Sequence, residues 1–361
     1  MSLVPPVGVA SPVKHDGSRI SNVAIGTTFW TGGWGARRRG CYNAWVSALV
    51  LVTGGAGFIG SHLTERLLID GYRVRVLDDF STGSPANLPF ADQHRGSLEV
   101  IRGDIRDLPT LERCAASAEL VFHQAAMRSV PRSVKDPLGA NDHNVTGTLN
   151  VLEAARRAGI RRVVYASSSS VYGDRPDLPK REDQPPAPVS PYAVSKAAGE
   201  LYAGVWTRLY GVETVGLRYF NVFGPRQDPA SEYAAVIPRF ILWGLRRQPL
   251  EVHGDGRQSR DFTYIENVVQ ANVLAARADG VGGQVFNVGC GERVSLLGIV
   301  TELERLLGRT LERRHTPVRP GDVLHTLADI DRAKRLLGYA PQVAFGEGFH
   351  RTVEYFRGGA G

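Results

Sequence analysis

Tyr192 and Lys196 are four residues apart in the segment SPYAVSKAAGEL, so a helix through this segment would present both side chains on one face. A free tyrosine has a pKa near 10, and it can act as a general base at neutral pH only if that pKa falls by roughly 3 units. An ammonium group beside the phenol lowers the pKa because it stabilises the phenolate. The pair therefore predicts proton abstraction by Tyr192, with Lys196 supplying positive charge.

Four consecutive hydroxyl side chains, Ser167 to Ser170, stand at the end of an apolar run in YASSSSVYGD. Buried strands rarely carry four polar positions in a row. The run therefore predicts that at least one of these hydroxyls takes part in the chemistry. The alternative is that the serines only satisfy backbone groups where the strand ends.

A glycine-rich stretch, TGGAGFIG, follows the first apolar run and precedes an amphipathic helix. In this context the pattern predicts a cradle for a dinucleotide, because glycines let the backbone approach a pyrophosphate and the helix N-terminus offers N–H groups to it. The glycines concerned are Gly54, Gly55, Gly57 and Gly60.

Asp78 ends the second apolar run, 21 residues after Gly57. A carboxylate at this place accepts hydrogen bonds from an adenosine ribose and repels a 2′-phosphate. No arginine occurs in the following DDFSTGS, so the sequence favours NAD over NADP as the cofactor. Asp104 ends the third run, where it would either meet the adenine edge or cap the next helix; both alternatives stay open.

Strand and helix patterns alternate from residue 48 onward, which predicts an α/β fold of the Rossmann type with a doubly wound parallel sheet. A smaller C-terminal α/β lobe would bind the substrate. The expected division is a disordered extension over 1–47, an NAD-binding domain with the catalytic residues over 48–225, and the lobe over 226–361. The expected strands are 48–53, 72–78, 98–104, 118–126, 160–169 and 213–224, and the expected helices are 61–70, 108–117, 144–159 and 190–211.

Composition is that of a globular protein, with 43% hydrophobic and 22% charged residues among 361. No run reaches the roughly 18 apolar residues that a membrane span needs. The net charge is +7, but +4 of it belongs to residues 1–47, so we expect no nucleic-acid partner. The cysteines Cys41, Cys114 and Cys290 form no CxxC pair, which indicates reduced thiols, a cytoplasmic location and no metal site.

Residues 1–47 are rich in Gly, Ser, Thr and Pro and lack the layout of a signal peptide. We expect a disordered tail or a start codon assigned too early. A docking arm that uses Trp30, Trp34 and Arg37 to Arg39 is the alternative.

In combination, these motifs resemble an extended short-chain dehydrogenase/reductase of the nucleotide-sugar epimerase/dehydratase family. TGGAGFIG, GDI, HQAA, SSSSVYG, SPYAVSK, LRYFNVFGP, SRDFTYI and RPGD follow one another in the family's order from residue 48 to about 345. The phrases VPRSVKDP, YAAVIP and SRDFTYIENVVQAN are most similar to UDP-glucose and UDP-N-acetylglucosamine 4-epimerases.

The resemblance implies a role for each matching residue. Tyr192 would take the proton from the sugar O4 hydroxyl, Lys196 would bind the nicotinamide ribose, and Ser168 would relay the proton. The implied NAD contacts are Gly54, Gly57, Phe58, Ile59, Gly60, Asp78, Asp104, Ile105, Ala125, Asn144, Tyr192, Lys196 and Phe220. The implied substrate contacts are Ser168, Tyr192, Asn221, Val236, Arg260, Arg319, Asp322 and Thr326, with the arginines suited to a diphosphate.

The family's chemistry would be reversible oxidation at C4 of the sugar, through a transient 4-keto intermediate. Related dehydratases and decarboxylases carry acidic residues after the strand hydroxyl, because those reactions need a further acid or base. Ser169 and Ser170 occupy these positions, so the sequence favours epimerisation of UDP-hexoses.

The sugar specificity depends on two positions. Thr326 is small and would admit UDP-N-acetylglucosamine, whereas Arg128 replaces the small residue expected in enzymes specific for N-acetyl sugars. We therefore expect both N-acetylated and plain hexoses as substrates. A UDP-glucuronate 4-epimerase, another nucleotide-sugar dehydratase or decarboxylase, and a non-catalytic NAD-binding regulator are the alternatives.

A homodimer is expected, because the helices after Asn144 and around Tyr192 are apolar on more than one face. The family commonly pairs through such helices. No membrane partner is expected.

Overall fold

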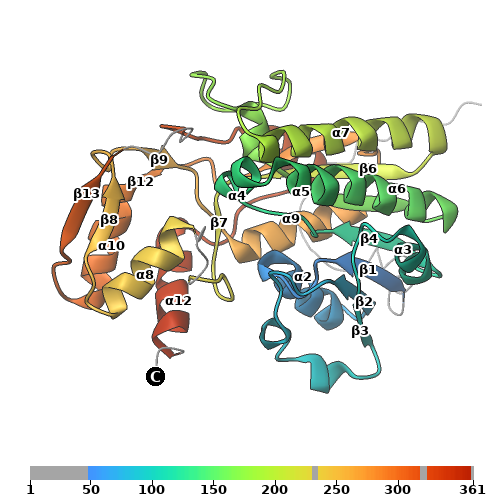
Figure 1. Cartoon of the computed structure of the whole chain (residues 1–361), viewed down its shortest axis with the longest axis horizontal. Helices are drawn as coiled ribbons and strands as arrows, with labels where there is room; N and C mark the ends of the chain where they lie inside the picture. The colour runs from blue at the N-terminus through green and yellow to red at the C-terminus, as the bar shows by residue number, and fades with distance from the viewer. Residues whose placement is uncertain (1–47, 230–234, 318–322, 359–361) are drawn as a thin grey trace, which may run out of the picture. The chain divides into compact units, whose positions relative to one another are not determined.

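The computed structural model describes residues 48–229, 235–317 and 323–358, all within the compact unit Cys41–Gly361. Figure 1 shows how the helices and strands of this part are arranged. The tail expected at residues 1–47 and the predicted substrate residues Arg319 and Asp322 lie outside the described residues. The predicted boundary near residue 225 stays a prediction.

A seven-stranded parallel sheet forms the centre of the fold, with the spatial order β11-β6-β5-β4-β1-β2-β3. It confirms the predicted doubly wound α/β architecture. Six strands match the predicted runs, and the seventh, β11, was not predicted. The strands are β1 Leu49–Thr53, β2 Arg73–Asp78, β3 Leu98–Arg102, β4 Leu120–His123, β5 Arg162–Ser168, β6 Glu213–Tyr219 and β11 Gln284–Val288.

Helices cover both faces of the sheet. On one face α2 (Phe58–Ile69) packs against α9 (Ile265–Arg277), and on the other α6 (Gly147–Arg157) packs against both α3 (Leu108–Ala115) and α7 (Pro191–Tyr210). Strand β1 shows why the sheet needs both layers, since alternate side chains of a strand point to opposite faces. Its residues 50 and 52 join the larger apolar cluster, and residues 49 and 51 join the other.

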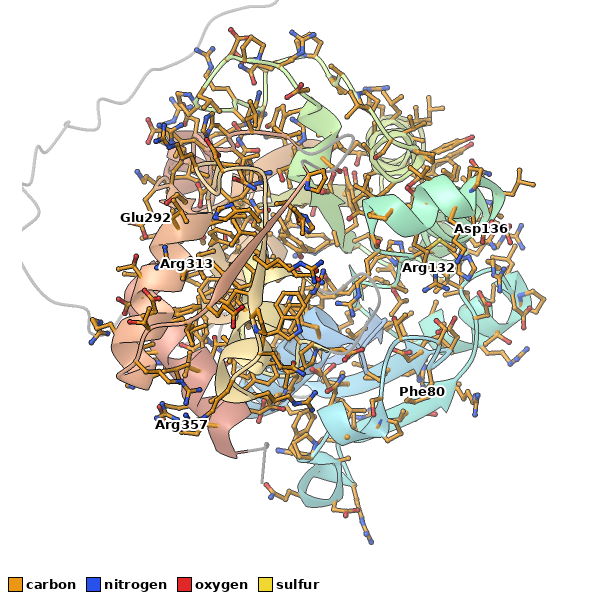
Figure 2. The ribbon with its side chains drawn as sticks, turned by 60° about the vertical axis from the view of Figure 1, so that its left-hand side comes forward. Phe80, Arg132, Asp136, Glu292, Arg313 and Arg357 are labelled. Atoms are coloured by element: carbon orange, nitrogen blue, oxygen red, sulfur yellow. The ribbon has the colours of Figure 1, made fainter. Side chains whose placement is uncertain are left out.

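A C-terminal lobe forms beside the sheet from α8, β8, α10, β13 and α12, and Figure 1 shows these elements together in yellow to red. In it β8 pairs in parallel with β13, and α8 packs against α10 and α12. In Figure 2, Glu292, Arg313 and Arg357 lie on one side of the ribbon, and Phe80, Arg132 and Asp136 on the other. The lobe's elements are α8 Val236–Leu245, β8 Leu250–His253, α10 Leu296–Leu307, β13 Arg313–Thr316 and α12 Phe345–Gly358.

Short segments connect these layers. Within the described ranges, no helix is both long enough and apolar enough to cross a bilayer. The short segments are η1 Pro85–Asn87, η2 Ala91–His94, α4 Val130–Lys135, α5 Pro137–Asn141, η3 Asp142–Thr146, η4 Ser169–Tyr172, β7 Val222–Phe223, β9 Ser259–Arg260, β10 Thr263–Tyr264, β12 Val294–Ser295 and α11 Asp331–Leu337.

The order of the strands reverses between β1 and β4. From β1 the chain moves outward through β2 and β3, and it then returns to β4 and moves the other way through β5 and β6. The connections that leave β1 and β4 therefore diverge, and a crevice opens at the carboxyl ends of these strands. The fold thus predicts a ligand site at this edge.

Candidate active site

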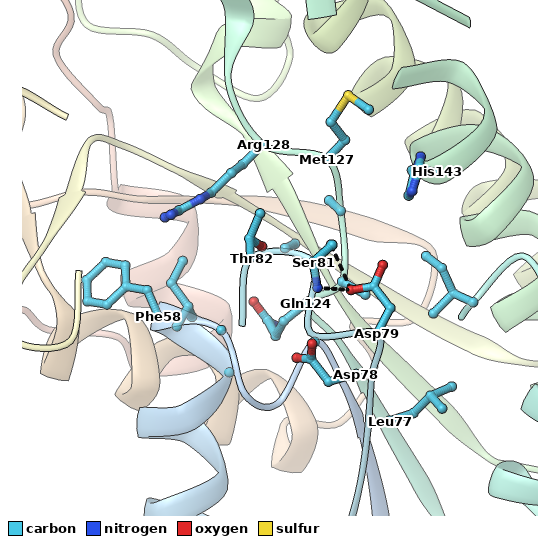
Figure 3. A pocket seen from close by; sticks show the side chains of 18 of the residues that line it. Phe58, Leu77, Asp78, Asp79, Ser81, Thr82, Gln124, Met127, Arg128 and His143 are labelled. Atoms are coloured by element: carbon cyan, nitrogen blue, oxygen red, sulfur yellow. Dashed lines mark hydrogen bonds between the residues drawn. The ribbon is translucent and has the colours of Figure 1, made fainter. Parts of the chain in front are cut away.

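A pocket lies at that edge, and Figure 3 shows the side chains that line it. It draws residues from the loops after β1, β2, β3 and β4 and from helix α7. Most of the predicted cofactor residues meet here. They are Gly54, Gly57, Phe58, Ile59, Gly60, Asp78, Asp104, Ile105, Ala125, Tyr192 and Lys196.

The glycine loop lies too close to its neighbours to admit side chains. Gly54 has φ +71°, and a Cβ at this position would lie 2.6 Å from the Ala125 backbone nitrogen. A Cβ on Gly60 would overlap the carbonyl of Gly54. Helix α2 begins after Gly57 with no side-chain cap and no acidic residue in its first turn. Its first N–H groups therefore face the pocket as a site for an anion, which fits the diphosphate of a dinucleotide.

Asp78 ends β2 and holds the glycine loop in place. Its Oδ2 accepts a hydrogen bond from the Ala56 N–H at 2.9 Å, and its Oδ1 accepts one from the Phe80 N–H at 2.9 Å. Burial raises the pKa of this carboxyl, while the backbone N–H groups act in the opposite direction. The carboxylate still lines the pocket, so it has lone pairs for the two hydroxyls of a ribose.

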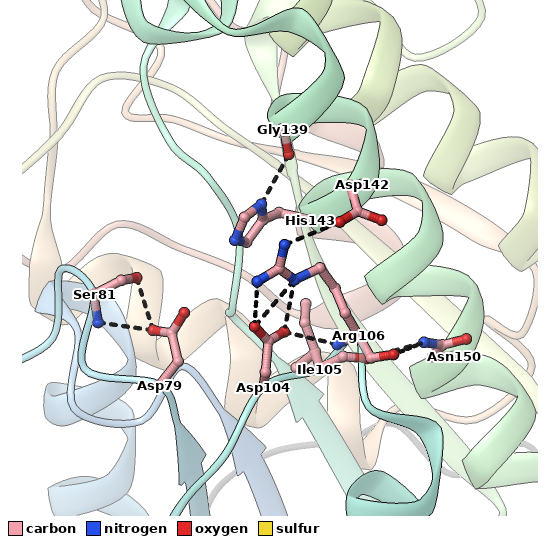
Figure 4. Close-up of polar contacts among 9 residues, drawn as sticks. All are labelled: Asp79, Ser81, Asp104, Ile105, Arg106, Gly139, Asp142, His143 and Asn150. Atoms are coloured by element: carbon pink, nitrogen blue, oxygen red, sulfur yellow. Dashed lines mark hydrogen bonds and ion pairs between the residues drawn. The ribbon is translucent and has the colours of Figure 1, made fainter.

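Asp104 also lines the pocket, and Figure 4 shows its polar contacts. The Arg106 guanidinium donates to both of its carboxylate oxygens, and this contact lowers the pKa of Asp104. Helix α3 has Asp107 at its N-cap, so the predicted capping role of Asp104 is not observed. Asp79 and His143 each offer an atom within 4.8 Å of Asp104, and these two residues were not predicted.

Asn144 and Phe220, two predicted cofactor residues, are buried and are not among the residues that line the pocket. Asn144 accepts a hydrogen bond from the Met127 N–H at 2.7 Å and donates to the Met127 carbonyl at 3.1 Å. It thereby fixes the segment after β4 that forms one wall. Phe220 packs against Tyr172, with 6.2 Å between the ring centroids. Direct contact of either residue with the cofactor stays a prediction.

Tyr192 is the second residue of α7, and its backbone N–H donates to the Ser133 Oγ at 3.0 Å. Ser168 lies close enough to the Tyr192 phenol to influence its titration, and its role as a proton relay stays a prediction. Burial raises the pKa of Tyr192, while Ser168 and the positive charge of Arg128 lower it. The protein's own groups therefore do not reduce the pKa below that of a free tyrosine.

Lys196 lies one turn along α7, on the face that Tyr192 shares. Its Nζ lies 5.9 Å from the centroid of the Tyr192 ring and donates to the Ala166 carbonyl at 2.9 Å. Burial lowers the pKa of Lys196 to about 8. Arg128 is a second cation near Tyr192, and its positive charge lowers the pKa of the phenol.

The four serines have different environments. The Ser167 Oγ donates to Glu200 at 2.5 Å, and the Ser168 Oγ accepts from the Ser170 N–H at 3.1 Å as strand β5 passes into η4. Ser169 and Ser170 belong to η4, so no carboxylate side chain stands directly after Ser168.

Three predicted substrate residues, Asn221, Arg260 and Thr326, lie close together next to the C-terminal lobe. Asn221 follows β6, and its Nδ2 donates to the Thr326 Oγ1 at 3.2 Å. Arg260 donates to the Leu324 carbonyl at 2.7 Å, close to Thr326 along the chain. Ser168 pairs in register with Tyr219 on β6, so Asn221 comes two residues after the strand position beside Ser168. Val236 begins α8 in the lobe.

Asp261 was missed by the sequence analysis, although it follows Arg260 directly. It is fully buried and accepts hydrogen bonds from the N–H groups of Cys290 at 2.8 Å, Gly291 at 3.0 Å and Ala328 at 3.1 Å. These bonds hold the segment that carries Thr326. The sequence feature that could have revealed this role is an aspartate directly before the aromatic segment FTYI, where an acidic side chain needs hydrogen-bond donors if it is buried.

Residues 50–289 match the NAD-dependent epimerase/dehydratase family. A UDP-glucose 4-epimerase of Mycolicibacterium smegmatis is 43% identical over 309 residues, which cover 85% of this chain and 98% of the relative.

Two solved structures have the same fold. The UDP-N-acetylglucosamine 4-epimerase from Methanobrevibacter ruminantium, in complex with UDP-N-acetylmuramic acid, is 39% identical with a TM-score of 0.82, covering 87% of this chain and 99% of that one. The UDP-glucose 4-epimerase of Thermus thermophilus, solved with NAD, is 38% identical with a TM-score of 0.78, covering 86% and 99%.

Proposed function

The chain belongs to the NAD-dependent epimerase/dehydratase family, and from this premise we propose that it is a 4-epimerase of UDP-sugars. Its principal pair would be UDP-N-acetylglucosamine and UDP-N-acetylgalactosamine, and UDP-glucose and UDP-galactose would share the pocket. The observation that carries the proposal is that Tyr192 and Lys196 line one pocket with the glycine loop, with Ser168 beside the phenol and serines where a dehydratase would need acids.

NAD, when bound, supplies the hydride acceptor and donor for C4 of the sugar. The pocket fits this cofactor because the glycine loop leaves no room for a Cβ at Gly54 or Gly60, and because Asp78 presents a carboxylate where a ribose would lie. Lys196 would hold the second ribose. The residues proposed for the rest of the dinucleotide are Gly57, Phe58, Ile59, Asp104, Ile105, Ala125, Asn144 and Phe220.

Tyr192 would accept the proton of the sugar O4 hydroxyl and later return it. Ser168 would bridge the two oxygens, since its hydroxyl can donate and accept at once. A positively charged ligand beside the phenol would complete the decrease in pKa that Arg128 begins.

Asn221, Arg260 and Thr326 are proposed to bind the UDP-sugar. They come from separate parts of the chain and lie together at the edge of the lobe. Thr326 has a small side chain, which would leave space for an N-acetyl group on the sugar. Val236, Arg319 and Asp322 complete the proposed set.

Purified protein incubated with UDP-N-acetylglucosamine should form UDP-N-acetylgalactosamine without added NAD, because an NAD that is regenerated in each cycle can stay bound. Proton NMR of the mixture measures the product. Release of water or carbon dioxide from any UDP-sugar would contradict epimerisation. A protein that binds NAD and converts no UDP-sugar would instead be a regulator.

UDP-glucuronate is a second candidate substrate, favoured by Arg128. This guanidinium lines the pocket beside Tyr192 and extends, in Figure 3, toward the side where Phe58 lies. A carboxylate at C6 of the sugar is a group that arginine binds well. Competition between UDP-glucuronate and UDP-N-acetylglucosamine in one NMR assay ranks the two substrates.

A homodimer through α7 and its neighbours is also proposed. Leu201 is 73% exposed and Leu209 is 70% exposed on α7, and Leu138 on the adjacent α5 is 83% exposed. Apolar side chains grouped in this way favour a protein interface. Light scattering should give a mass twice that of one chain, and the substitution Leu201→Glu should reduce the measured mass to that of a single chain.

A further inference from the structure

The proposed reaction does not explain how the charge of the buried Lys196 ammonium is compensated. Its side chain is buried, and moving an ammonium out of water is costly unless an anion compensates it. Its Nζ donates a hydrogen bond to a neutral group, the Ala166 carbonyl. Among the described residues, the negative charge that acts on Lys196 is that of Glu200, one turn further along α7.

Glu200 is held firmly in a place with little access to water. Its side chain is 8% exposed, and that of its partner Arg218 on β6 is 4% exposed. The guanidinium donates from Nε to Oε1 at 2.9 Å and from Nη2 to Oε2 at 2.7 Å. The Ser167 hydroxyl donates a third bond, at 2.5 Å. These three donors hold the Glu200 carboxylate in one orientation.

Arg218 is fixed in turn from a third strand. Its guanidinium lies 4.7 Å from the centroid of the Tyr172 ring, and the Tyr172 hydroxyl donates to the Asn287 Oδ1 on β11 at 2.7 Å. The charged pair is therefore anchored across β5, β6 and β11.

We propose that Glu200, locked by Arg218 and Ser167, is the positioning residue that keeps Lys196 protonated and so sets the upper pH limit of the reaction. This inference rests on the proposed function, because it assigns a role around the proposed base. It also assigns different roles to two serines of the run: Ser167 orients Glu200, the counter-ion of Lys196, while Ser168 lies beside the phenol of Tyr192.

The other groups around Lys196 do not supply the negative charge that keeps it protonated. His123 on β4 is neutral, since burial lowers its pKa to about 3. The groups facing Lys196 and Tyr192 are Tyr192 and Glu200 from α7, His123 from β4, Ser167 and Ser168 from β5, Arg218 from β6 behind Glu200, Arg128 from the segment after β4, Ser133 from α4, and Asn144 from η3 through Ser195.

The test uses the NAD-loaded enzyme and the variant Glu200→Gln, which keeps the size of the side chain and removes its charge. The double variant E200Q/R218M is measured beside it, because it leaves no unpaired buried arginine and therefore guards against a folding defect. Glu213→Gln is the matched control, since Glu213 pairs with the buried Arg162 at 2.7 Å across the opposite ends of the same two strands.

Two readouts are needed. The first is the pH profile of kcat/KM, and the second is the tyrosinate absorbance of the NAD-loaded protein, taken as the difference from Tyr192→Phe. We expect the alkaline limb of the profile to shift to lower pH by about one unit in E200Q and in the double variant. At a pH above the limb, this shift lowers kcat/KM by about tenfold. The Tyr192 titration should move up in the same variants, and E213Q should change neither.

The proposal is overturned if the E200Q and E200Q/R218M profiles superimpose on that of wild type, or if E213Q shifts as far as they do. A wild-type enzyme that converts no UDP-sugar refutes the proposed function instead. In that case the tyrosinate titration still decides whether Glu200 sets the charge around Tyr192.

Discussion

Replacing Lys196 with methionine should stabilise the nucleotide-free protein at neutral pH while it abolishes activity. Methionine has a similar length and no charge, so the substitution removes the cost of burying an ammonium. The pKa of Lys196 falls from 10.5 to about 8 on folding, a difference of about 2.5 units, which corresponds to about 3 kcal/mol.

The size of the effect depends on pH in a defined way. Below pH 8 the lysine is charged in both states, so folding carries the full cost of burial. Between pH 8 and pH 10.5 the unfolded chain holds the proton and the folded chain does not, so the stability of the wild type rises with pH. Above pH 10.5 the lysine is neutral in both states.

Urea unfolding of both nucleotide-free proteins at pH 7 and at pH 10 measures this effect. Between these two values the wild type should gain about 2 to 3 kcal/mol relative to Lys196→Met. Other titrating groups occur in both proteins and cancel in the difference. Lys135→Met, at an exposed position, is the control and should show no such change. A difference between the proteins that is independent of pH would refute the reasoning.

Three further substitutions test the rest of the site. Tyr192→Phe should lower turnover by roughly 10²- to 10⁴-fold with NAD still bound, and wild-type rates would refute its role as the base. Asp78→Asn should raise the affinity for NADP relative to NAD, measured by calorimetry, because it removes the charge that repels a 2′-phosphate; an unchanged ratio would contradict that role. Gly54→Ala should destabilise the protein by about 1 to 3 kcal/mol more than Gly159→Ala, which has a similar φ of +68° and no atom within 4 Å of its Cβ, and equal losses in urea unfolding would argue against the tight cradle.

The sequence predicted the parts of the fold that depend on local pattern. Strand β1 is a continuous apolar run because it is buried on both faces, and this pattern is visible without a structure. Strand β11 was missed because its sequence, QVFNV, is short, is partly polar and lies in the region where the alternation of strand and helix breaks. Its buried asparagine, Asn287, is fully hydrogen-bonded: its Oδ1 accepts from the Tyr172 hydroxyl, and its Nδ2 donates to two backbone carbonyls.

The site was predictable where one motif carries one role. Tyr192 and the glycine loop line one pocket as expected, since each lies where an element begins at the same edge of the sheet. Ser168 lies beside the Tyr192 phenol. The charges acting on Tyr192 were not predictable. Spacing along α7 indicates Lys196 beside Tyr192, but it does not reveal Arg128, which comes from the segment after β4 and whose charge lowers the pKa of the phenol. Electrostatic influence depends on burial and direction, which spacing does not give.

The place of β11 in the sheet affects how this enzyme could be recombined with its relatives. The chain leaves the sheet after β6, builds α8 and β8 in the lobe, comes back for α9 and β11, and leaves again for α10 and β13. A chimera joined once near residue 225 would take its edge strand, and the asparagine that holds Tyr172, from the foreign parent. Exchange of the C-terminal lobe alone therefore requires several junctions, with residues 265–288 kept from the parent that supplies the rest of the sheet.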